Sequence, residues 1–315
     1  MDELQKSARR ALVTGTTGYI GSNLAKRLVA DGWDVHVIVR PTAKLDALDP
    51  IRPSITLHEH DGSTRNMIQL VSDARPDVVF HLASLFLAQH RPEDVEALIA
   101  SNLLFSTQLA EAMAANQVKY LINTSTSWQH YEDAEYNPVN LYAATKQAFE
   151  DILAYYIDSC GLRVMTLALF DTYGPNDSRP KLIPLLWKTT LDQEPFAMSP
   201  GEQMIDLVHI DDVIDAFIIG AAQLPEQGQG HMRYGISSGM PLRLKDLVVA
   251  FEQATGFKLP IVWGGRAYRS REVMLPWSNY TMLPRWQPRV PFEIGILKTW
   301  PAQHAHREPL HIPPQ

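Results

Sequence analysis

The stretch Ala11-Leu-Val-Thr-Gly-Thr-Thr-Gly-Tyr-Ile-Gly-Ser-Asn-Leu-Ala-Lys-Arg-Leu28 decides the fold of this chain. Its first four residues form an apolar run typical of a buried strand, and the apolar residues of its second half recur at helical spacing. Gly15, Gly18 and Gly21 lie between them. Glycines allow a tight turn that a phosphate can approach, and the helix N-terminus offers that phosphate unpaired N–H groups. The spacing predicts a dinucleotide site, and the alternative is an ordinary strand-to-helix turn.

The end of the next apolar run favours NADP(H) as the cofactor. Residues 33–40 read as a strand that ends at Arg40. An acidic residue about 20 residues beyond the last glycine would bind the ribose hydroxyls of NAD, whereas an arginine pairs with the 2′-phosphate of NADP. We therefore predict NADP(H), with NAD as the alternative cofactor. The other interpretation of Arg40 is a solvated loop charge.

Length, charge and cysteine content point to a soluble α/β protein. The chain has 315 residues, 45% of them hydrophobic, and a net charge of −7, which disfavours nucleic acid and anionic membranes as partners. The single cysteine, Cys160, excludes an internal disulfide; we expect it to be a small buried residue at a helix end. Residues 1–10 are charged, and no run reaches the roughly 18 apolar residues of a membrane span. We expect a cytoplasmic location.

Strand and helix patterns alternate up to residue 170, as a doubly wound parallel sheet requires. The expected strands are 11–14, 33–40, 55–58, 76–83, 120–125 and 163–170, and the expected helices begin at Ile20 and cover 67–72, 92–116 and 142–159. We predict a Rossmann domain over residues 1–170 and a smaller C-terminal substrate lobe over 171–315. Within the second half, residues 205–221 should return to the main domain as a strand and a helix.

Several polar and glycine residues follow the carboxyl ends of these strands, where ligands bind in such sheets. They are Gly15, Arg40, Asp61, His81, Thr126 and Asp171. Their convergence predicts one site at this edge of the sheet.

A tyrosine and a lysine lie four residues apart in Tyr142-Ala-Ala-Thr-Lys146, and so share one helix face. Free tyrosine has a pKa near 10, and a nearby ammonium favours the phenolate, so we expect the pKa of Tyr142 to be lowered. The pair can then exchange protons near pH 7. Thr126, or its neighbour Ser127, could hydrogen-bond the reacting oxygen. The alternative is a solvated helix face.

Taken together, these motifs resemble the extended short-chain dehydrogenase/reductases, the NAD(P)-dependent epimerase/dehydratase group. The resemblance covers residues 10–290 and rests on Gly15-x-x-Gly18-x-x-Gly21, His81-Leu-Ala-Ser84, Thr124-Ser-Thr126, Tyr142-x-x-x-Lys146 and Tyr173-Gly-Pro175. It implies a nucleotide-activated sugar as substrate. It also implies that Tyr142 exchanges a proton with the sugar oxygen while the nicotinamide exchanges hydride, and that Lys146 also holds the nicotinamide ribose.

The resemblance extends this assignment to individual residues. Asp61 and Gly62 would lie by the adenine, Leu82, Ala83 and Ser84 along the middle of the cofactor, and Leu169 and Phe170 by the nicotinamide. The remaining cofactor contacts are expected at Gly15, Thr17, Gly18, Tyr19, Ile20, Gly21, Arg40, Thr124, Tyr142 and Lys146. Substrate contacts are expected at Ser84, Thr126, Ser127, Asp171, Lys181 and Arg271. Asn102 matches an asparagine near the active site, and His209-Ile-Asp-Asp212 a segment that supports the fold.

Departures from the family pattern narrow the range of reactions that this chain is expected to catalyse. Many members carry Gln-x-Arg-Asp, whose arginine binds the substrate diphosphate, where this chain has Gln203-Met-Ile-Asp206. Arg271, Lys181 or Arg179 could replace that contact, the alternative being ordinary surface charge. Ser127-Trp128 stands where dehydratases have Asp-Glu. The short segment between Thr126 and Tyr142 and its sequence are similar to those of CDP-abequose synthase-type 4-ketoreductases.

The leading hypothesis is therefore reduction of the C4 ketone of a nucleotide-linked 4-keto-6-deoxyhexose by NADPH. Tyr142 would supply the proton, Lys146 would tune it and Thr126 would polarise the ketone. The alternatives are an epimerase with tightly bound NAD and a non-catalytic NADP-sensing protein. We expect no metal site at His304, His306 and His311, and a homodimer formed through helices 92–116 and 142–159.

Overall fold

A seven-stranded parallel sheet forms the centre of the computed structural model, which describes residues 8–226, 228 and 230–300. Its strand order is β11-β6-β5-β4-β1-β2-β3, with β1 Arg10–Thr14, β2 Asp34–Val39, β3 Ile55–Glu59, β4 Val78–His81, β5 Tyr120–Thr126, β6 Arg163–Leu169 and β11 Gly230–Ile236. The order reverses between β1 and β4, which creates the crevice where doubly wound sheets bind ligands. The expected Rossmann fold is confirmed.

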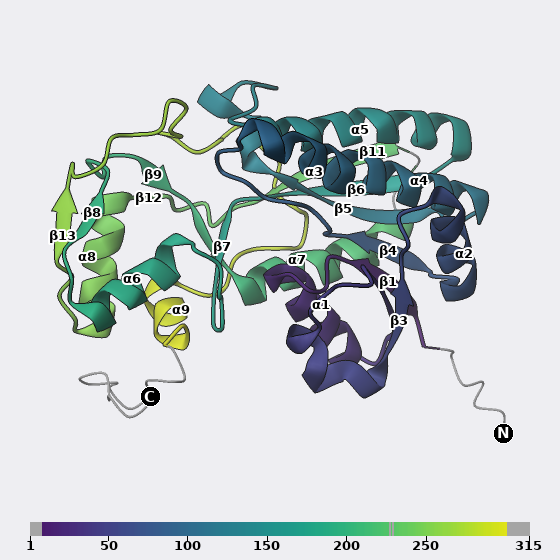
Figure 1. Ribbon diagram of the computed structural model, residues 1–315, viewed down its shortest axis with the longest axis horizontal. Helices are drawn as coiled ribbons and strands as arrows, with labels where there is room; N and C mark the ends of the chain where they lie inside the picture. Colours follow the sequence, from purple (N-terminus) through teal and green to yellow (C-terminus); the bar gives the residue numbers. More distant parts are fainter. Residues whose placement is uncertain (1–7, 227, 229, 301–315) are drawn as a thin grey trace.

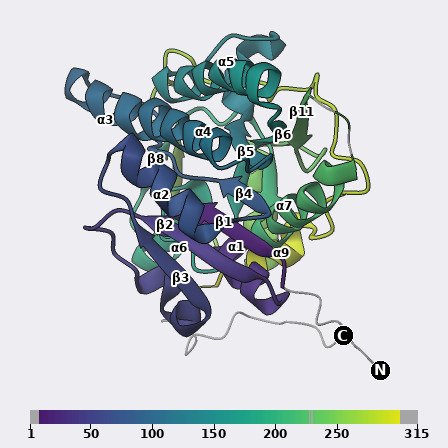
Figure 2. The same cartoon turned by 90° about the vertical axis from the view of Figure 1, so that its right-hand side faces the viewer.

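Helices cover both faces of this sheet (Figure 1). On one face α2 Thr64–Ala74, α4 Phe105–Ala115 and α5 Leu141–Cys160 bury one apolar cluster, and on the other α1 Tyr19–Ala30 and α7 Ile210–Gln223 bury a second. The turned view in Figure 2 shows α4 and α5 on one side of the strands and α1 and α7 on the other. Because both faces are covered, the strands read as nearly continuous apolar runs.

The helix expected over 92–116 is a composite. Its parts are the 3-10 turn η2 Pro92–Asp94, α3 Val95–Ile99, the π-helical segment η3 Ala100–Leu104 and α4. The wider π turn is a local departure from helical spacing that an apolar pattern does not reveal. It places Asn102 in the interior with 1% of its surface exposed.

A smaller unit packs around its own apolar core, which includes Leu186, Trp187, Leu247 and Phe251. It comprises α6 Leu182–Asp192, α8 Leu244–Thr255 and α9 Phe292–Lys298, with the paired strands β8 Phe196–Met198 and β13 Ile261–Trp263, and β9 Met204–Ile205 and β12 Leu242–Arg243. Strands β7 Asp171–Tyr173 and β10 Leu207–His209 pair with each other, and short 3-10 turns cover Asp46–Ser54, Ser127–Gln129, Tyr131–Asp133 and Leu224–Glu226.

The second half of the chain contributes more to the main sheet than its sequence indicates. Within residues 205–221, α7 packs against the main sheet, whereas β10 pairs with β7 outside it. Strand β11 is an addition that the sequence pattern missed: it pairs with β6 at the sheet edge, and most of its residues are half-buried. The division into two domains at residue 170 stays a prediction.

The exposure of Cys160 differs from the sequence-based expectation. The sequence predicted a buried residue, but Cys160 is exposed. It ends α5 just before Gly161, whose φ of 70° lets the chain leave the helix, and this last turn lies beyond the packed part of the helix. Among the helices of the described part of the chain, none is long and apolar enough to cross a membrane.

Candidate functional site

The glycine turn forms a tight cradle at the N-terminus of α1. Gly15 has φ +76°, and a Cβ there would lie 2.6 Å from the backbone N of Ala83, while a Cβ at Gly21 would collide with the backbone of Gly15. Gly18 caps the helix, whose first turn carries no acidic side chain. Because the glycines carry no side chain, an anion can come close to the backbone of the turn. The N–H groups at the start of α1 have no partner within the helix and can donate hydrogen bonds to that anion. The turn therefore fits the pyrophosphate of a dinucleotide.

The residues expected to contact the cofactor beyond the glycine turn follow strands β2 and β3. Arg40 is exposed directly after β2, on the edge of the sheet where Gly15 lies. Asp61 follows β3 and accepts a hydrogen bond from the N–H of Ser63 at 2.8 Å, and the carbonyl of Gly62 accepts one from the Gln108 side chain at 2.9 Å. The fold thus brings these residues to the same edge as the glycine turn.

A cavity of about 410 Å³ extends from this turn to the expected catalytic residues. That volume lies within the usual range for small-molecule sites. The predicted residues that line it are Gly15, Gly18, Tyr19, Ile20, Gly21, Leu82, Ser84, Thr124, Thr126, Ser127, Tyr142, Lys146, Leu169, Phe170, Asp171 and Lys181. Thr17, Arg40, Asp61, Gly62, Ala83 and Arg271 are not among its lining residues.

Tyr142 and Lys146 lie together on α5 at the inner end of this cavity. The Lys146 ammonium is 6.0 Å from the centre of the Tyr142 ring. Burial raises the pKa of Tyr142 to about 12, although a hydrogen bond with Ser84 opposes the rise. Burial also lowers the pKa of Lys146 to about 8, against the attraction of Glu150. The expectation of a lowered Tyr142 pKa is wrong, because burial outweighs the distant ammonium.

Tyr142 therefore keeps its proton to a higher pH than free tyrosine does. A protonated phenol donates a hydrogen bond and can transfer its proton to a developing alkoxide, which has a much higher proton affinity. The Thr126 hydroxyl, 8% exposed at the end of β5, lines the same cavity and accepts a hydrogen bond from Trp128 N–H at 3.3 Å. The cavity is therefore lined by both the Tyr142 phenol and the Thr126 hydroxyl.

Asn102 fixes the loop that carries Ser84. Its side-chain oxygen accepts hydrogen bonds from Ser84 Oγ at 3.1 Å and Leu85 N at 2.6 Å, and its amide donates to Leu85 O at 3.0 Å and Thr145 Oγ1 at 3.0 Å. Thr145 stands beside Lys146 on α5. Asn102 thus ties the loop after β4 to the helix that carries the tyrosine and lysine.

His81, which ends β4, is a structural residue rather than part of the cavity wall. Its side chain is fully buried, and its ring nitrogens lie 2.8 Å from Thr14 Oγ1 and 2.8 Å from Ser106 Oγ. Thr14 Oγ1 in turn accepts from the N–H groups of Leu82 and Ala83, both at 3.2 Å. His81 therefore supports the glycine turn through Thr14, the residue that precedes Gly15.

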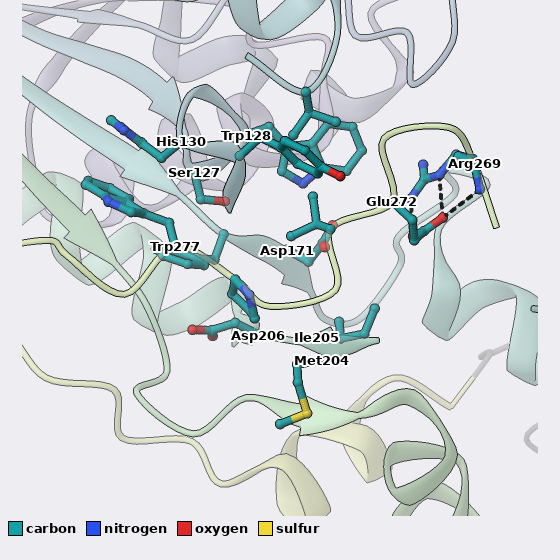
Figure 3. Close-up of a pocket in the computed structure, with 15 residues that line it drawn as sticks. Ser127, Trp128, His130, Asp171, Met204, Ile205, Asp206, Arg269, Glu272 and Trp277 are labelled. Atoms are coloured by element: carbon teal, nitrogen blue, oxygen red, sulfur yellow. Dashed lines mark hydrogen bonds and ion pairs between the residues drawn. The ribbon is translucent and has the colours of Figure 1, made fainter. Parts of the chain in front are cut away.

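Asp171 lies between the main cavity and a second, smaller one of about 40 Å³. Its carboxylate pairs with Lys181 at 3.1 Å, and the Lys181 ammonium lies 4.5 Å from the centre of the Phe86 ring. Figure 3 shows the smaller cavity, with Arg269 and Glu272 at one end and His130 and Trp277 at the other. Met204 and Ile205 contribute apolar lining where an arginine is usual in the resembled family.

Two arginines near this smaller cavity differ in their placement. Arg269 lines the cavity, pairs with Glu272 at 2.8 Å, and lies 5.5 Å from the centre of the Trp128 ring. Arg271 is not among the lining residues; its guanidinium donates to Asn137 at 2.5 Å and lies 4.3 Å from the centre of the Tyr131 ring. Arg269 is therefore better placed than Arg271 to contact a substrate.

Sequence reasoning missed part of the aromatic lining of the site, although it placed Tyr19 and Phe170 there. Phe86 packs edge-on to Tyr142, with ring centres 5.0 Å apart, and lies 5.6 Å from Trp128. Trp277 stacks on His130 at 3.8 Å. Trp128 follows Thr126 closely and could have been found there, but Trp277 lies in an irregular segment with no periodicity to place it.

Two segments remain, one expected to support the fold and one expected to hold no metal. His209 caps α7 by accepting from Asp211 N–H at 3.2 Å, and Asp212 accepts from the N–H groups of Arg289 and Val290 at 3.0 and 3.1 Å. His304, His306 and His311 lie outside the described residues. Within the described ranges, no group of three or more metal-binding side chains is present.

Comparison with known proteins assigns most of the chain to the family that its motifs resemble. The model of the NAD dependent epimerase/dehydratase family matches residues 11–236. CDP-abequose synthase of Salmonella muenchen is 24% identical, with 92% of this chain and 96% of that protein covered. UDP-glucose 4-epimerase of Mycolicibacterium smegmatis is 28% identical, with 92% and 97% covered. The solved structure of UDP-glucose 4-epimerase from Thermotoga maritima with UDP-glucose has a TM-score of 0.83 at 24% identity, with 95% and 100% covered.

Proposed function

Because this chain belongs to the NAD-dependent epimerase/dehydratase family, we propose that it is a reductase that converts the C4 ketone of a nucleotide-linked 4-keto-6-deoxyhexose to an alcohol. The observation that carries this proposal is Tyr142, which lines one cavity together with Lys146 and Thr126 and has its pKa raised to about 12. A ketone reductase needs a residue that holds a proton until the alkoxide forms. Tyr142 meets that requirement.

Each residue of the site has a separate role in the proposed reaction. A bound nicotinamide supplies the hydride. Tyr142 donates its proton to the sugar oxygen, and the Thr126 hydroxyl hydrogen-bonds the same oxygen and stabilises its developing charge. The Lys146 ammonium makes the phenol more acidic at the moment of transfer. Ser84 and Asn102 keep the Tyr142 hydroxyl aimed into the cavity through the hydrogen bonds described above.

Arg40 supports NADPH as the preferred form of the cofactor. An exposed guanidinium at the end of β2 can pair with the adenosine 2′-phosphate. Replacing Arg40 by Ala should therefore weaken NADPH binding while leaving NADH binding close to its original value. Fluorescence titration with the two cofactors measures both effects, and an equal loss for both would remove Arg40 from this role.

The substrate assignment rests on relatives and on the cavity wall. CDP-abequose synthases of Salmonella and Yersinia are among the similar proteins, at 24–26% identity. In this chain Ile205 replaces the usual arginine, so we propose that Arg269 and Lys181 contact the diphosphate. We also propose that Phe86 and Trp128 pack against the deoxysugar.

The direct experiment mixes the purified protein with NADPH or NADH and a CDP- or dTDP-4-keto-6-deoxyhexose, and follows absorbance at 340 nm. Consumption of NADPH in preference to NADH supports the proposed reaction. UDP-glucose 4-epimerases are also among the relatives, so epimerisation is the second candidate. No oxidation of NADPH with the 4-keto sugar, together with conversion of UDP-glucose to its C4 epimer in the NMR spectrum without added cofactor, would favour that second function.

We further propose that the protein is a cytoplasmic homodimer. Large apolar side chains are exposed on the segments expected to pair, including Leu104 at 52% and Tyr155 at 63%. Covering such side chains with a second copy across a two-fold axis would remove apolar surface from water. Light scattering on the eluting protein measures the assembly state.

A further inference from the structure

Glu150 is a buried carboxylate directly behind the proposed catalytic residues. It lies one helical turn beyond Lys146 on α5, and 2% of its surface is exposed. Its Oε1 accepts hydrogen bonds from Ser125 Oγ at 2.9 Å and Gln129 Nε2 at 3.0 Å. Its Oε2 accepts from Arg233 Nε at 2.6 Å. A buried charge is costly unless it is paired and hydrogen-bonded, and this one is both.

These contacts join three elements that meet behind the cavity. Helix α5 carries Glu150 together with Tyr142 and Lys146, strand β5 carries Ser125 next to Thr126, and strand β11 carries Arg233. Gln129 belongs to the turn that follows β5, and its amide also donates to Gln147 Oε1 on α5 at 2.9 Å. The carboxylate is thus the common acceptor that links the helix to the end of the strand.

We propose that Glu150 is a positioning residue, which holds the end of β5 against α5 and keeps the Lys146 ammonium charged beside Tyr142. The proposal rests on the proposed function for the roles of Tyr142, Lys146 and Thr126. Glu150 itself touches neither substrate nor cofactor, and acts through Ser125 and Lys146.

The charges around Lys146 support this role. Burial lowers the pKa of Lys146 to about 8, and Glu150 opposes that shift. From β4, His81 faces Lys146, and burial lowers the pKa of His81 to about 3. From β11, His231 lies 3.8 Å from Glu150, and burial lowers the pKa of His231 to about 4. Both imidazoles and the Tyr142 phenol stay neutral between pH 6 and 9, so Glu150 supplies the opposing charge near the ammonium, and Arg233 acts on it through its ion pair with Glu150.

Two substitutions should therefore move the Lys146 titration in opposite directions. Glu150→Gln removes the attracting charge, so the ammonium should lose its proton at lower pH. Arg233→Met removes the cation that neutralises Glu150, so the ammonium should persist to higher pH. The expected shift is about one pH unit for Glu150→Gln, at the lower end of the range for an opposite charge close by. It should be smaller for Arg233→Met, whose side chain is 55% exposed. His231→Gln is the matched control, because it changes a neutral neighbour of the same carboxylate.

The experiment measures this titration in two ways on the full-length protein. One is the upper limb of the kcat–pH profile with NADPH and the 4-keto sugar, and the other is the ¹⁵N chemical shift of Lys146 Nζ without substrate. Opposite shifts in Glu150→Gln and Arg233→Met, with His231→Gln unchanged, support the proposal. A lower kcat with an unmoved Lys146 titration in both variants would overturn it. If Glu150→Gln does not fold, the half-exposed Arg233→Met still decides the question. Absence of turnover in the wild type counts against the proposed function alone, because the NMR titration requires no reaction.

Discussion

Replacing Gly15 by Ala tests whether the glycine turn is as tight as the structure shows. Two costs combine at this position. A non-glycine residue at φ +76° is strained by about 1–2 kcal/mol. In addition, the new Cβ would lie 2.6 Å from Ala83 N and 2.6 Å from Leu82 C, and relieving such overpacking costs about 1–3 kcal/mol. We therefore expect Gly15→Ala to lower the free energy of unfolding by about 2–5 kcal/mol.

Gly32→Ala is the matched control for this variant. Gly32 follows α1 with φ +79°, and a Cβ there would meet nothing within 4 Å, so this substitution carries the strain without the clash. Urea denaturation gives the free energy of unfolding of both variants, and fluorescence titration gives their affinity for NADPH. Gly15→Ala should lose more stability than Gly32→Ala, and only Gly15→Ala should lose NADPH affinity. Equal losses in the two variants would refute the close approach of the turn to Ala83.

Three further outcomes are expected. Tyr142→Phe should lower turnover by a factor of about 10² or more, because it removes the proton donor. NADPH affinity, measured by fluorescence titration, should stay near the wild-type value. Unchanged turnover would contradict the proposed role of Tyr142. The free energy of unfolding should fall below pH 6.5, and His81 contributes up to about 1.4 kcal/mol per pH unit to this fall, because unfolded histidine binds a proton there and buried His81, with its pKa lowered to about 3, does not. His231, whose pKa burial lowers to about 4, contributes in the same direction. In denaturation at several pH values, His81→Gln should make that dependence less steep, and an unaltered slope would contradict the contribution assigned to His81. Leu104→Glu should convert a dimer to a monomer in light scattering, whereas Val249→Glu, at a similarly exposed apolar residue on α8, should leave the dimer intact.

The sequence was most informative where a local pattern of residues determines the geometry by itself. Glycine spacing between a strand and a helix defines a turn, and a tyrosine and lysine four residues apart share a helix face. Both therefore came from the residues alone, and the resemblance to the epimerase/dehydratase family added the surrounding cofactor positions. The structure brings Gly15, Thr126 and Asp171 from the predicted strand ends into one cavity with Tyr142 and Lys146, whereas Arg40, Asp61 and His81 do not line it.

Features that depend on distant contacts were not visible in the sequence. Arg233 approaches Glu150 across 83 residues, and it does so on β11, an edge strand without a clear apolar pattern. The environment of Tyr142 was judged from its neighbour Lys146, but burial by the whole cavity decides the direction of its pKa shift. Arg269 lies in a segment without regular structure, so only the folded chain shows that Arg269, rather than Arg271, lines the smaller cavity.

The fate of the transferred hydride tests the proposed reduction most directly. The protein would be incubated with NADPH that carries deuterium at the transferred position and with a CDP- or dTDP-4-keto-6-deoxyhexose, and the product would be analysed by NMR and mass spectrometry. The account predicts one deuterium at C4 of the sugar for each NADPH oxidised, and almost no labelled product with Tyr142→Phe. An unreduced C4 ketone, with the label still on the cofactor, would contradict it.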